Sequence, residues 1–143
     1  MFVGSYGYNG WLYSDLPKYY PQFENFVYIK TDGIENTTLT PVFVDANWVD
    51  LTPKEADGPW PDLYAGAPFG TSNDDGMGRC TIARHGVSSV SAAPRALTTN
   101  QKMPGAVTIG FADGHVHMTK LEELRTLNWH RDWKAPARPE VGQ

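Results

Sequence analysis

The sequence predicts an α+β fold in which an antiparallel β-sheet carries long irregular loops and one short helix near the C-terminus. Residues 106–119 alternate around an Asp-Gly pair, which is typical of a β-hairpin. The leucines that follow recur at a nearly helical spacing. Eleven prolines and fourteen glycines among 143 residues favour turns over long helices. We interpret residues 1–143 as one globular domain with a Pro-rich tail from about residue 134.

Composition narrows the class of protein. The net charge of −4 and the absence of a Lys/Arg cluster argue against nucleic-acid binding. No run of about 18 apolar residues is present, so we expect no membrane span in this chain. Cys80 is the only cysteine, which excludes an intrachain disulfide and a cysteine-based zinc site. No basic and apolar leader precedes the first residues, so either the protein is cytosolic or its true N-terminus lies upstream.

The first part of the chain is rich in glycine and aromatic residues. Residues 2–13 predict turns and short extended pieces, and residues 14–40 an irregular segment in which 26–29 form a short strand or a helical turn. We expect the aromatic side chains to pack against the hairpin. The alternative is a glycan-stacking or partner-contact platform built from Trp11, Tyr13 and Trp60.

The middle of the chain begins with a strand at residues 42–45 and continues into a Pro-rich surface loop over residues 51–73. A loop of this length inside a compact domain is often functional. We expect four apolar residues to hold it on the body of the protein: Trp60, Leu63, Tyr64 and Phe69.

Two motifs close this middle region. Asn73, Asp74 and Asp75 offer oxygen ligands for Ca²⁺, although the alternating spacing and closing glutamate of an EF-hand loop are missing. A solvated turn is the other interpretation. Residues 79–85 alternate, which predicts a strand with Cys80 and Ile82 on one side.

The hairpin is the most strongly specified element. A two-residue type I′ turn at Asp113 and Gly114 places Phe111 opposite Val116 and Ile109 opposite Met118. The strands then present one apolar face, formed by Val107, Ile109, Phe111, Val116 and Met118.

A helix is expected to follow the hairpin at once. Thr119 and Glu122 have the spacing of a capping box. Leucines at positions 121, 124 and 127 form its apolar side, and the helix ends near Asn128. Trp129 and Trp133 are expected to dock the end of the chain onto the body.

Histidines and carboxylates near the hairpin form the one candidate for chemistry. His115 and His117 point from the same side of their strand, and Asp113 and Asp45 could supply carboxylates to a structural or hydrolytic metal site. The alternative is an exposed polar sheet face. The sequence does not place His85 or His130 as the further ligand that zinc would need. For Arg84 and His85, a structural link to Asp113 is favoured over catalysis.

Residues 84–86 followed by residues 111–116 resemble the prepilin-type processing-associated domain, which is named for a His, nine residues and Asp-Gly. The motif residues in this chain are Arg84, His85, Asp113, Gly114 and His115. Further similarity lies at residues 5–12, 40–45, 77–79 and 124–130. Twenty-seven residues separate His85 from Asp113 here, so residues 87–104 count as an insertion.

The resemblance implies the globular head of a bacterial pseudopilin similar to type II secretion protein G, without the long N-terminal helix of that family. It implies a non-enzymatic structural subunit of an extracellular or envelope-associated pilus, pseudopilus or surface assembly. Its partners would be further copies or other pseudopilin-like subunits, and no cofactor is required. Two alternatives from the residues stay open. One is a metal-dependent hydrolase that uses Asp113, His115 and His117 together with His85 or His130, and the other is the glycan-binding module.

Overall fold

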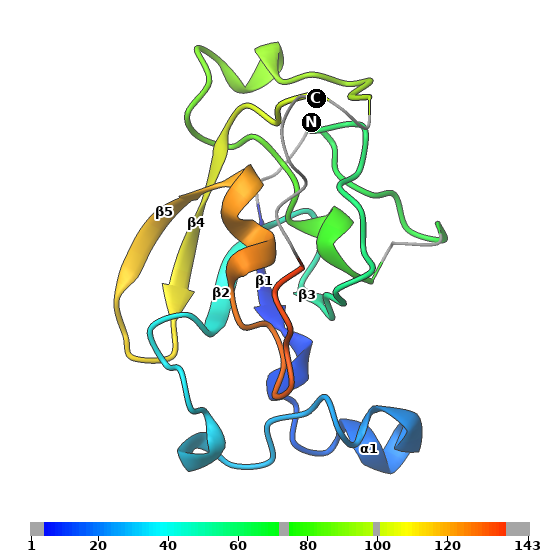
Figure 1. Cartoon of the computed structure of the whole chain (residues 1–143). Helices are drawn as coiled ribbons and strands as arrows, with labels where there is room; N and C mark the ends of the chain where they lie inside the picture. Colours follow the sequence, from blue (N-terminus) through cyan, green and yellow to red (C-terminus); the bar gives the residue numbers. More distant parts are fainter. Residues whose placement is uncertain (1–4, 72–74, 99–100, 137–143) are drawn as a thin grey trace.

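The computed structural model describes residues 5–71, 75–98 and 101–136, and a five-stranded mixed β-sheet lies at its centre (Figure 1). The strands are β1 (Ser5–Asn9), β2 (Pro41–Ala46), β3 (Asp50–Leu51), β4 (Ala106–Phe111) and β5 (Val116–Lys120). They lie in the order β3-β1-β2-β4-β5, with only the β1–β3 pair parallel. A β-sheet accompanied by a few short helices agrees with the predicted α+β class.

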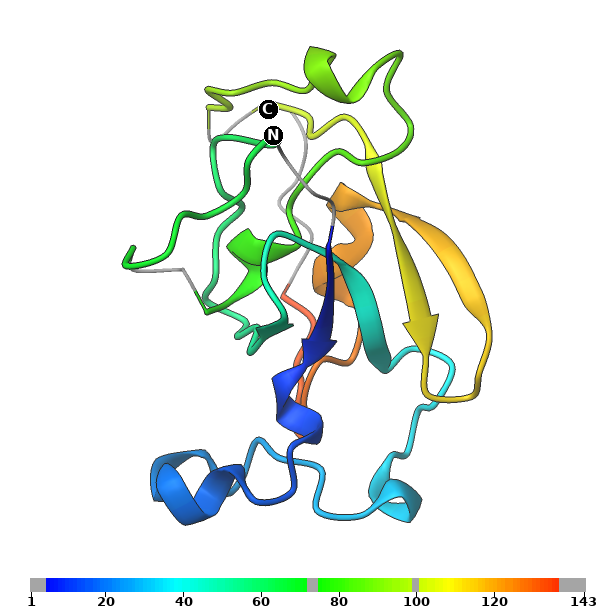
Figure 2. The same ribbon diagram turned by 180° about the vertical axis from the view of Figure 1, so that it is seen from behind.

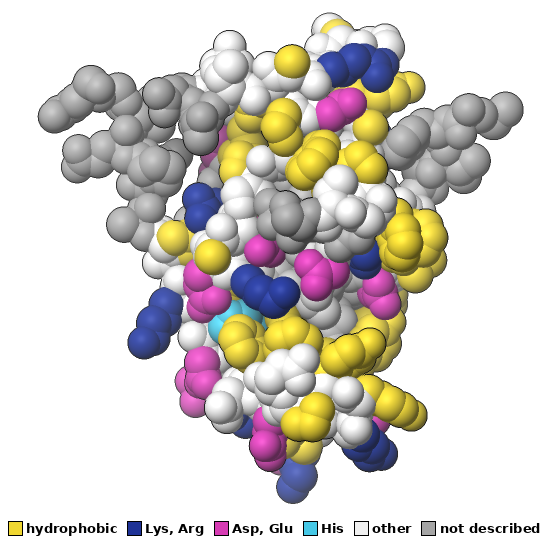
Figure 3. Space-filling view, turned by 90° about the vertical axis from the view of Figure 1, so that its right-hand side faces the viewer, with side chains coloured by type: hydrophobic (Ala, Val, Ile, Leu, Met, Phe, Trp, Pro, Cys, Tyr) yellow, Lys and Arg dark blue, Asp and Glu magenta, His cyan; other side chains and the backbone are white. Residues whose placement is uncertain are grey.

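The helices are short. The α-helix α1 spans Leu16–Tyr19, and the 3₁₀ helices are η1 (Gly10–Leu12), η2 (Pro21–Phe23), η3 (Thr31–Gly33), η4 (Met77–Arg79), η5 (Val90–Ala92) and η6 (Leu121–Thr126). None of the helices described is long and apolar enough to cross a membrane. Around β3 and α1, hydrophobic side chains are interspersed with acidic and basic ones (Figure 3).

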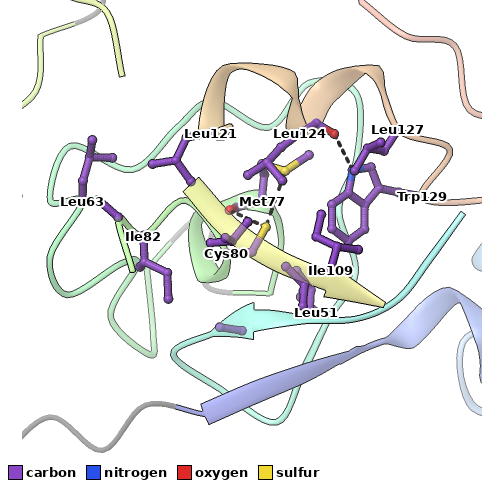
Figure 4. Packing of buried hydrophobic residues seen from close by; sticks show 14 of the residues in the cluster. Leu51, Leu63, Met77, Cys80, Ile82, Ile109, Leu121, Leu124, Leu127 and Trp129 are labelled. Carbon is purple, nitrogen blue, oxygen red and sulfur yellow. Dashed lines mark hydrogen bonds between the residues drawn. The ribbon is translucent and has the colours of Figure 1, made fainter. Parts of the chain in front are cut away.

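One face of the sheet is covered by the C-terminal segment and by the loops between β3 and β4. In Figure 4, Leu124, Leu127 and Trp129 lie against Ile109 of β4, and Met77 and Cys80 fill the space beside them. The Trp129 indole Nε1 donates to the Leu124 carbonyl at 2.8 Å. This arrangement confirms that Trp129 docks the end of the chain, and Trp133 packs against the same core in a partly buried position.

The capping box expected at the start of the helix after β5 does not form. Thr119 is still part of β5, where it pairs with Val107, and the residue that precedes η6 is Lys120. No side chain caps the helix, and the Thr119 hydroxyl has no hydrogen-bond partner among the described residues. The helix is 3₁₀ rather than α. A 3₁₀ helix repeats every three residues, so the leucine spacing of three places Leu121 and Leu124 on one buried side.

The hairpin forms, but its register differs by one residue from the prediction. Ile109 pairs with His117, and Gly110 pairs with Val116. Partners across a ladder share a face, so Val116 and Met118 lie on the face opposite to Ile109. Both side chains are exposed. The prediction that they join Val107, Ile109 and Phe111 in the core is therefore wrong.

The turn explains this shift. Phe111 N–H donates to the His115 carbonyl, and Gly114 N–H donates to the Phe111 carbonyl, both at 2.9 Å. These bonds close a loop over residues 112–114, in which Gly114 has a φ of +92°. No described residue other than glycine has a positive φ, which rules out a type I′ turn at Asp113. The pattern is that of a three-residue loop with glycine in the left-handed region.

The segment at residues 79–85 is not a strand. After η4 it runs irregularly to a single bridge between His85 and Ala106. Its backbone bonds with loops: the Arg79 carbonyl accepts from Asn47, and Ala83 N–H donates to the Leu63 carbonyl. Residues 77–83 are all buried, so the alternation in the sequence does not separate an inner from an outer face.

Several other expectations can be compared with the fold. The strand predicted at residues 42–45 is β2, and residues 26–29 form neither a strand nor a helix. The N-terminal segment contains β1, an inner strand of the sheet, which is one of the expected extended pieces. In the Pro-rich loop Leu63 is buried as expected, whereas Phe69 is exposed and does not hold the loop in place.

Candidate interaction surface

The second face of the sheet is left uncovered by the described residues. Figure 2 looks onto it: β1, β2, β4 and β5 run in front, and η6 lies behind them. The pairing register aligns Tyr8, Phe43, Gly110 and Val116 in one row across four strands. The neighbouring row of Gly7, Val44, Ile109 and His117 belongs to the covered face. We call the first side the open face.

Large apolar side chains gather on the open face. Tyr6 is 68% exposed, Phe43 52%, Val116 67% and Met118 56%. The Tyr8 ring contacts Phe43 with centroids 5.3 Å apart. The two rings are inclined by 61°, an edge-to-face contact between neighbouring strands.

The polar end of the open face is formed by Asp45 and His85. The Asp45 carboxylate accepts from Thr108 N–H at 2.7 Å and lies 3.2 Å from His85 Nε2. This contact replaces the predicted link to Asp113. His85 bridges with Ala106, which lies at the opposite end of β4 from the hairpin turn, so it cannot reach Asp113. Arg84 donates to the Tyr64 carbonyl at 3.1 Å instead, and burial lowers the pKa of its guanidinium.

Asp113, Gly114 and His115 form a local structure at the hairpin turn. The Asp113 carboxylate accepts from His115 N–H at 3.1 Å and lies 2.5 Å from His115 Nδ1. The backbone bond, and next the side-chain bond, lower the pKa of Asp113. The His115 ring stacks on Phe111 with centroids 4.4 Å apart and planes inclined by 4°. Asp113 and His115 thus stabilise the turn.

The residues proposed for a metal site are not brought together. Among the described residues, no group of three or more His, Cys, Asp or Glu side chains is arranged to hold a metal ion. Asp75 is described and lies 3.6 Å from Lys54 Nζ. Asn73 and Asp74 lie outside the described residues. The second predicted ligand set, His115, His117 and Asp113, reduces in this structure to the Asp113–His115 pair.

The predicted aromatic platform lacks one of its three residues, because Trp11 is not at the surface. Trp11 is fully buried, and its indole Nε1 donates to the Pro53 carbonyl at 2.7 Å, so it cannot contact a ligand at the surface. Tyr13 is exposed and lies against Tyr8 with ring centroids 5.0 Å apart. Trp60 is half-buried. Because Trp11 is buried, the three residues do not form one exposed surface.

Two further features were not predicted. His130 is buried and its Nε2 lies 3.0 Å from Glu55, a carboxylate that also accepts from Lys134 N–H. Burial raises the pKa of Glu55, but the two hydrogen bonds outweigh it and the net shift is downward. A shallow hollow of about 290 Å³ lies beside Trp48, Phe69 and Arg79.

The sequence contained a signal for the open face that the pattern analysis missed. Aromatic and apolar residues alternate with small or buried ones along β1 and β2, as at Tyr6 and Tyr8 or at Phe43. Such alternation identifies two faces but not which one becomes covered.

No protein-family model, curated protein or solved structure matches this chain.

Proposed function

We propose that this chain is a non-enzymatic structural subunit or interaction module of an extracellular or envelope-associated pilus-like, pseudopilus-like or surface assembly, and that the open face is its contact surface. The observation that carries the proposal is the set of exposed apolar side chains that β1, β2 and β5 place on one face of the sheet, which no described element covers. Proteins that stay monomeric rarely expose a continuous apolar surface of this kind.

The chemistry of the open face favours another protein as its partner. Its exposed side chains are aromatic and aliphatic, and the Asp45 carboxylate among them, opposite Tyr6, is already engaged by Thr108 and His85. Aromatic residues and methionine are enriched in protein interfaces. The Asp45 carboxylate satisfies a backbone donor, so its role in this structure is to hold the sheet rather than to present a reactive group.

The partner we propose is a second subunit of the same kind. The resemblance to pseudopilin heads supports this choice, since those proteins assemble from related subunits. The molecule is only mildly acidic, with a net charge of −4, so an apolar contact between copies meets little long-range repulsion.

The experiment is sedimentation velocity over a range of protein concentrations. We expect the wild-type chain to associate, and a double variant Tyr6→Lys/Phe43→Lys to associate more weakly, because charges placed on the open face cannot be desolvated cheaply. Both positions are exposed, so the thermal unfolding temperature should stay close to that of the wild type.

Tyr19→Lys is the matched control. Tyr19 is 74% exposed, but it lies on α1, away from the sheet. We expect this variant to associate like the wild type. A wild-type chain that stays monomeric throughout would contradict the proposal, and so would a double variant that associates as strongly as the control.

A further inference from the structure

The outer edge of β5 has backbone groups that no other strand uses. Phe111 N–H bonds to the His115 carbonyl, and Leu121 N–H bonds to the Gly105 carbonyl, at the two ends of the hairpin. In an antiparallel ladder, hydrogen-bonded and non-bonded pairs alternate. His117 and Thr119 therefore face β4 with their backbone groups, whereas the N–H and C=O of Val116 and Met118 point away from the sheet.

Nothing described protects this edge. The other edge of the sheet, β3, has only two residues, but β5 has five and no proline. The β4–β5 pairing runs from Gly110–Val116 to Ala106–Lys120 without a register shift. Lys120 is the one charged side chain of β5 and stands at its end. Proteins normally block exposed edges with prolines, bulges or several charges, because a bare edge pairs with other strands.

We infer that β5 pairs in antiparallel fashion with β5 of a second copy, around a two-fold axis at Met118, so that two five-stranded sheets join into one. This inference rests on the proposed function and adds a second contact between copies, made through the sheet edge, which leaves the open faces free to bind further subunits. A two-fold pair is self-complementary, and two-fold dimers are the commonest soluble oligomers. Adding a strand to an exposed sheet edge is a known mode of protein recognition.

The register follows from the side chains. With Met118 opposite its own copy, Val116 lies opposite Lys120, and no two like charges face each other across the new ladder. Each Lys120 then lies towards the hairpin turn that carries Asp113 in the other copy. A register centred on His117 would instead place two imidazoles directly opposite each other. The two open faces end up on the same side of the joined sheet.

Amide hydrogen exchange at increasing protein concentration tests the pairing. The amides of Val116 and Met118 should exchange about fivefold more slowly when the total concentration is about ten times the dimer dissociation constant. The amides of His117 and Thr119 already bond to β4, so their exchange should change much less.

The outcomes separate this inference from the proposed function. Association that leaves the Val116 and Met118 amides unprotected would overturn the β5 pairing and leave the open face as the contact surface. The absence of any association would overturn both.

Thiol cross-linking provides a second test that does not depend on exchange rates. Cys80 is fully buried, and burial raises the pKa of its thiol, so it contributes little reactivity. A short bis-maleimide should link Met118→Cys into a covalent dimer, since the two positions 118 meet at the axis. Tyr19→Cys, at a more exposed position on α1, should give far less dimer. Equal yields from the two variants at the same concentration would contradict the inference.

Discussion

On the covered face of the sheet, Val44 and Ile109 are sealed beneath η6, the loops and Trp129, whereas on the open face Phe43 and Val116 lie in the neighbouring row with no described element above them. The two rows come from the same strands and differ by one position in each. Both contain large apolar residues. What separates them is the path of the chain after each strand, which brings the C-terminal segment to one side only.

This difference shows that an apolar row on a strand has two possible uses. On the covered face it contributes to the free energy of folding, while on the open face the same kind of surface is available for association. Substitutions at matched positions should therefore change stability on one face and association on the other.

The largest contrast is expected between Trp129 and Phe43. Trp129→Ala should reduce the free energy of unfolding by about 3–5 kcal/mol, because a fully buried indole is lost and a cavity remains. Phe43→Ala should cost less than about 1 kcal/mol, because the ring is half exposed before the change. Urea unfolding at a protein concentration low enough to prevent association measures both, and similar losses for the two variants would refute the assignment of the faces.

Gly7 on the covered face and Gly110 on the open face provide a second comparison of the two faces. A Cβ at Gly7 would lie 2.8 Å from the Ala46 Cβ and 3.0 Å from the Trp48 carbonyl, so Gly7→Ala should cost about 1–3 kcal/mol through overpacking. A Cβ at Gly110 on the open face would meet no atom within 4 Å. Gly110→Ala should stabilise the strand by about 0.5–1 kcal/mol. Thermal melts of the two variants would decide, and a destabilised Gly110→Ala would mean that the open face is not open.

Two buried threonines, Thr119 and Thr40, test how a side-chain hydrogen bond contributes to the free energy of unfolding. The Thr119 hydroxyl is buried without a partner among the described residues, so Thr119→Val should stabilise the fold by about 1 kcal/mol. Thr40 is the control, because it is equally buried and its hydroxyl donates to the Asn36 carbonyl at 2.9 Å. Thr40→Val should cost about 1 kcal/mol. Opposite signs in chemical denaturation are the expected result; two losses of equal size would contradict it.

The smallest effect concerns the contact between Glu55 and His130 at the end of the chain. Hydrogen bonds lower the pKa of Glu55 below its ordinary value of 4.5 in the folded state, so its contribution to stability is fully present above that value. The contribution is lost as the pH falls through the folded pKa. The difference in unfolding temperature between the wild type and Glu55→Gln should thus be constant near neutral pH and shrink as the pH falls from 4.5 through the lower pKa of the folded state. A difference that grows on acidification would reverse the sign and exclude this account.

Local patterns in the sequence were sufficient for β2, for the existence of the hairpin and for the burial of Trp129. They failed where a distant segment intervened. The hairpin turn includes Ala112 because the N–H groups of Ala112 and Asp113 donate to the carbonyls of Thr40 and Thr37, which lie 72 and 76 residues earlier in the sequence. The partner of His85 was mispredicted because the sequence could not locate Asp45 beside it.

The candidate surface was only partly accessible to sequence reasoning. Trp11, which belongs to the alternative glycan platform, is buried as the favoured packing prediction requires, whereas Val116 and Met118, predicted on the apolar hairpin face, are exposed. The two outcomes have the same origin. Hydrophobicity indicates that a side chain can be buried, but the exposure of a given residue depends on which segments cover it.

The sequence by itself determined that the chain forms strands at residues 42–45 and around Asp113-Gly114, because alternation and turn preferences act between near neighbours. The tertiary structure alone decided the strand order, the register of β5 and the choice of covered face. These depend on contacts between residues far apart in the chain, such as Asn9 donating to the Trp129 carbonyl at 2.8 Å. A one-residue change in register exchanges the two faces of a strand, so those long-range contacts place Val116 and Met118 on the surface that we propose for assembly.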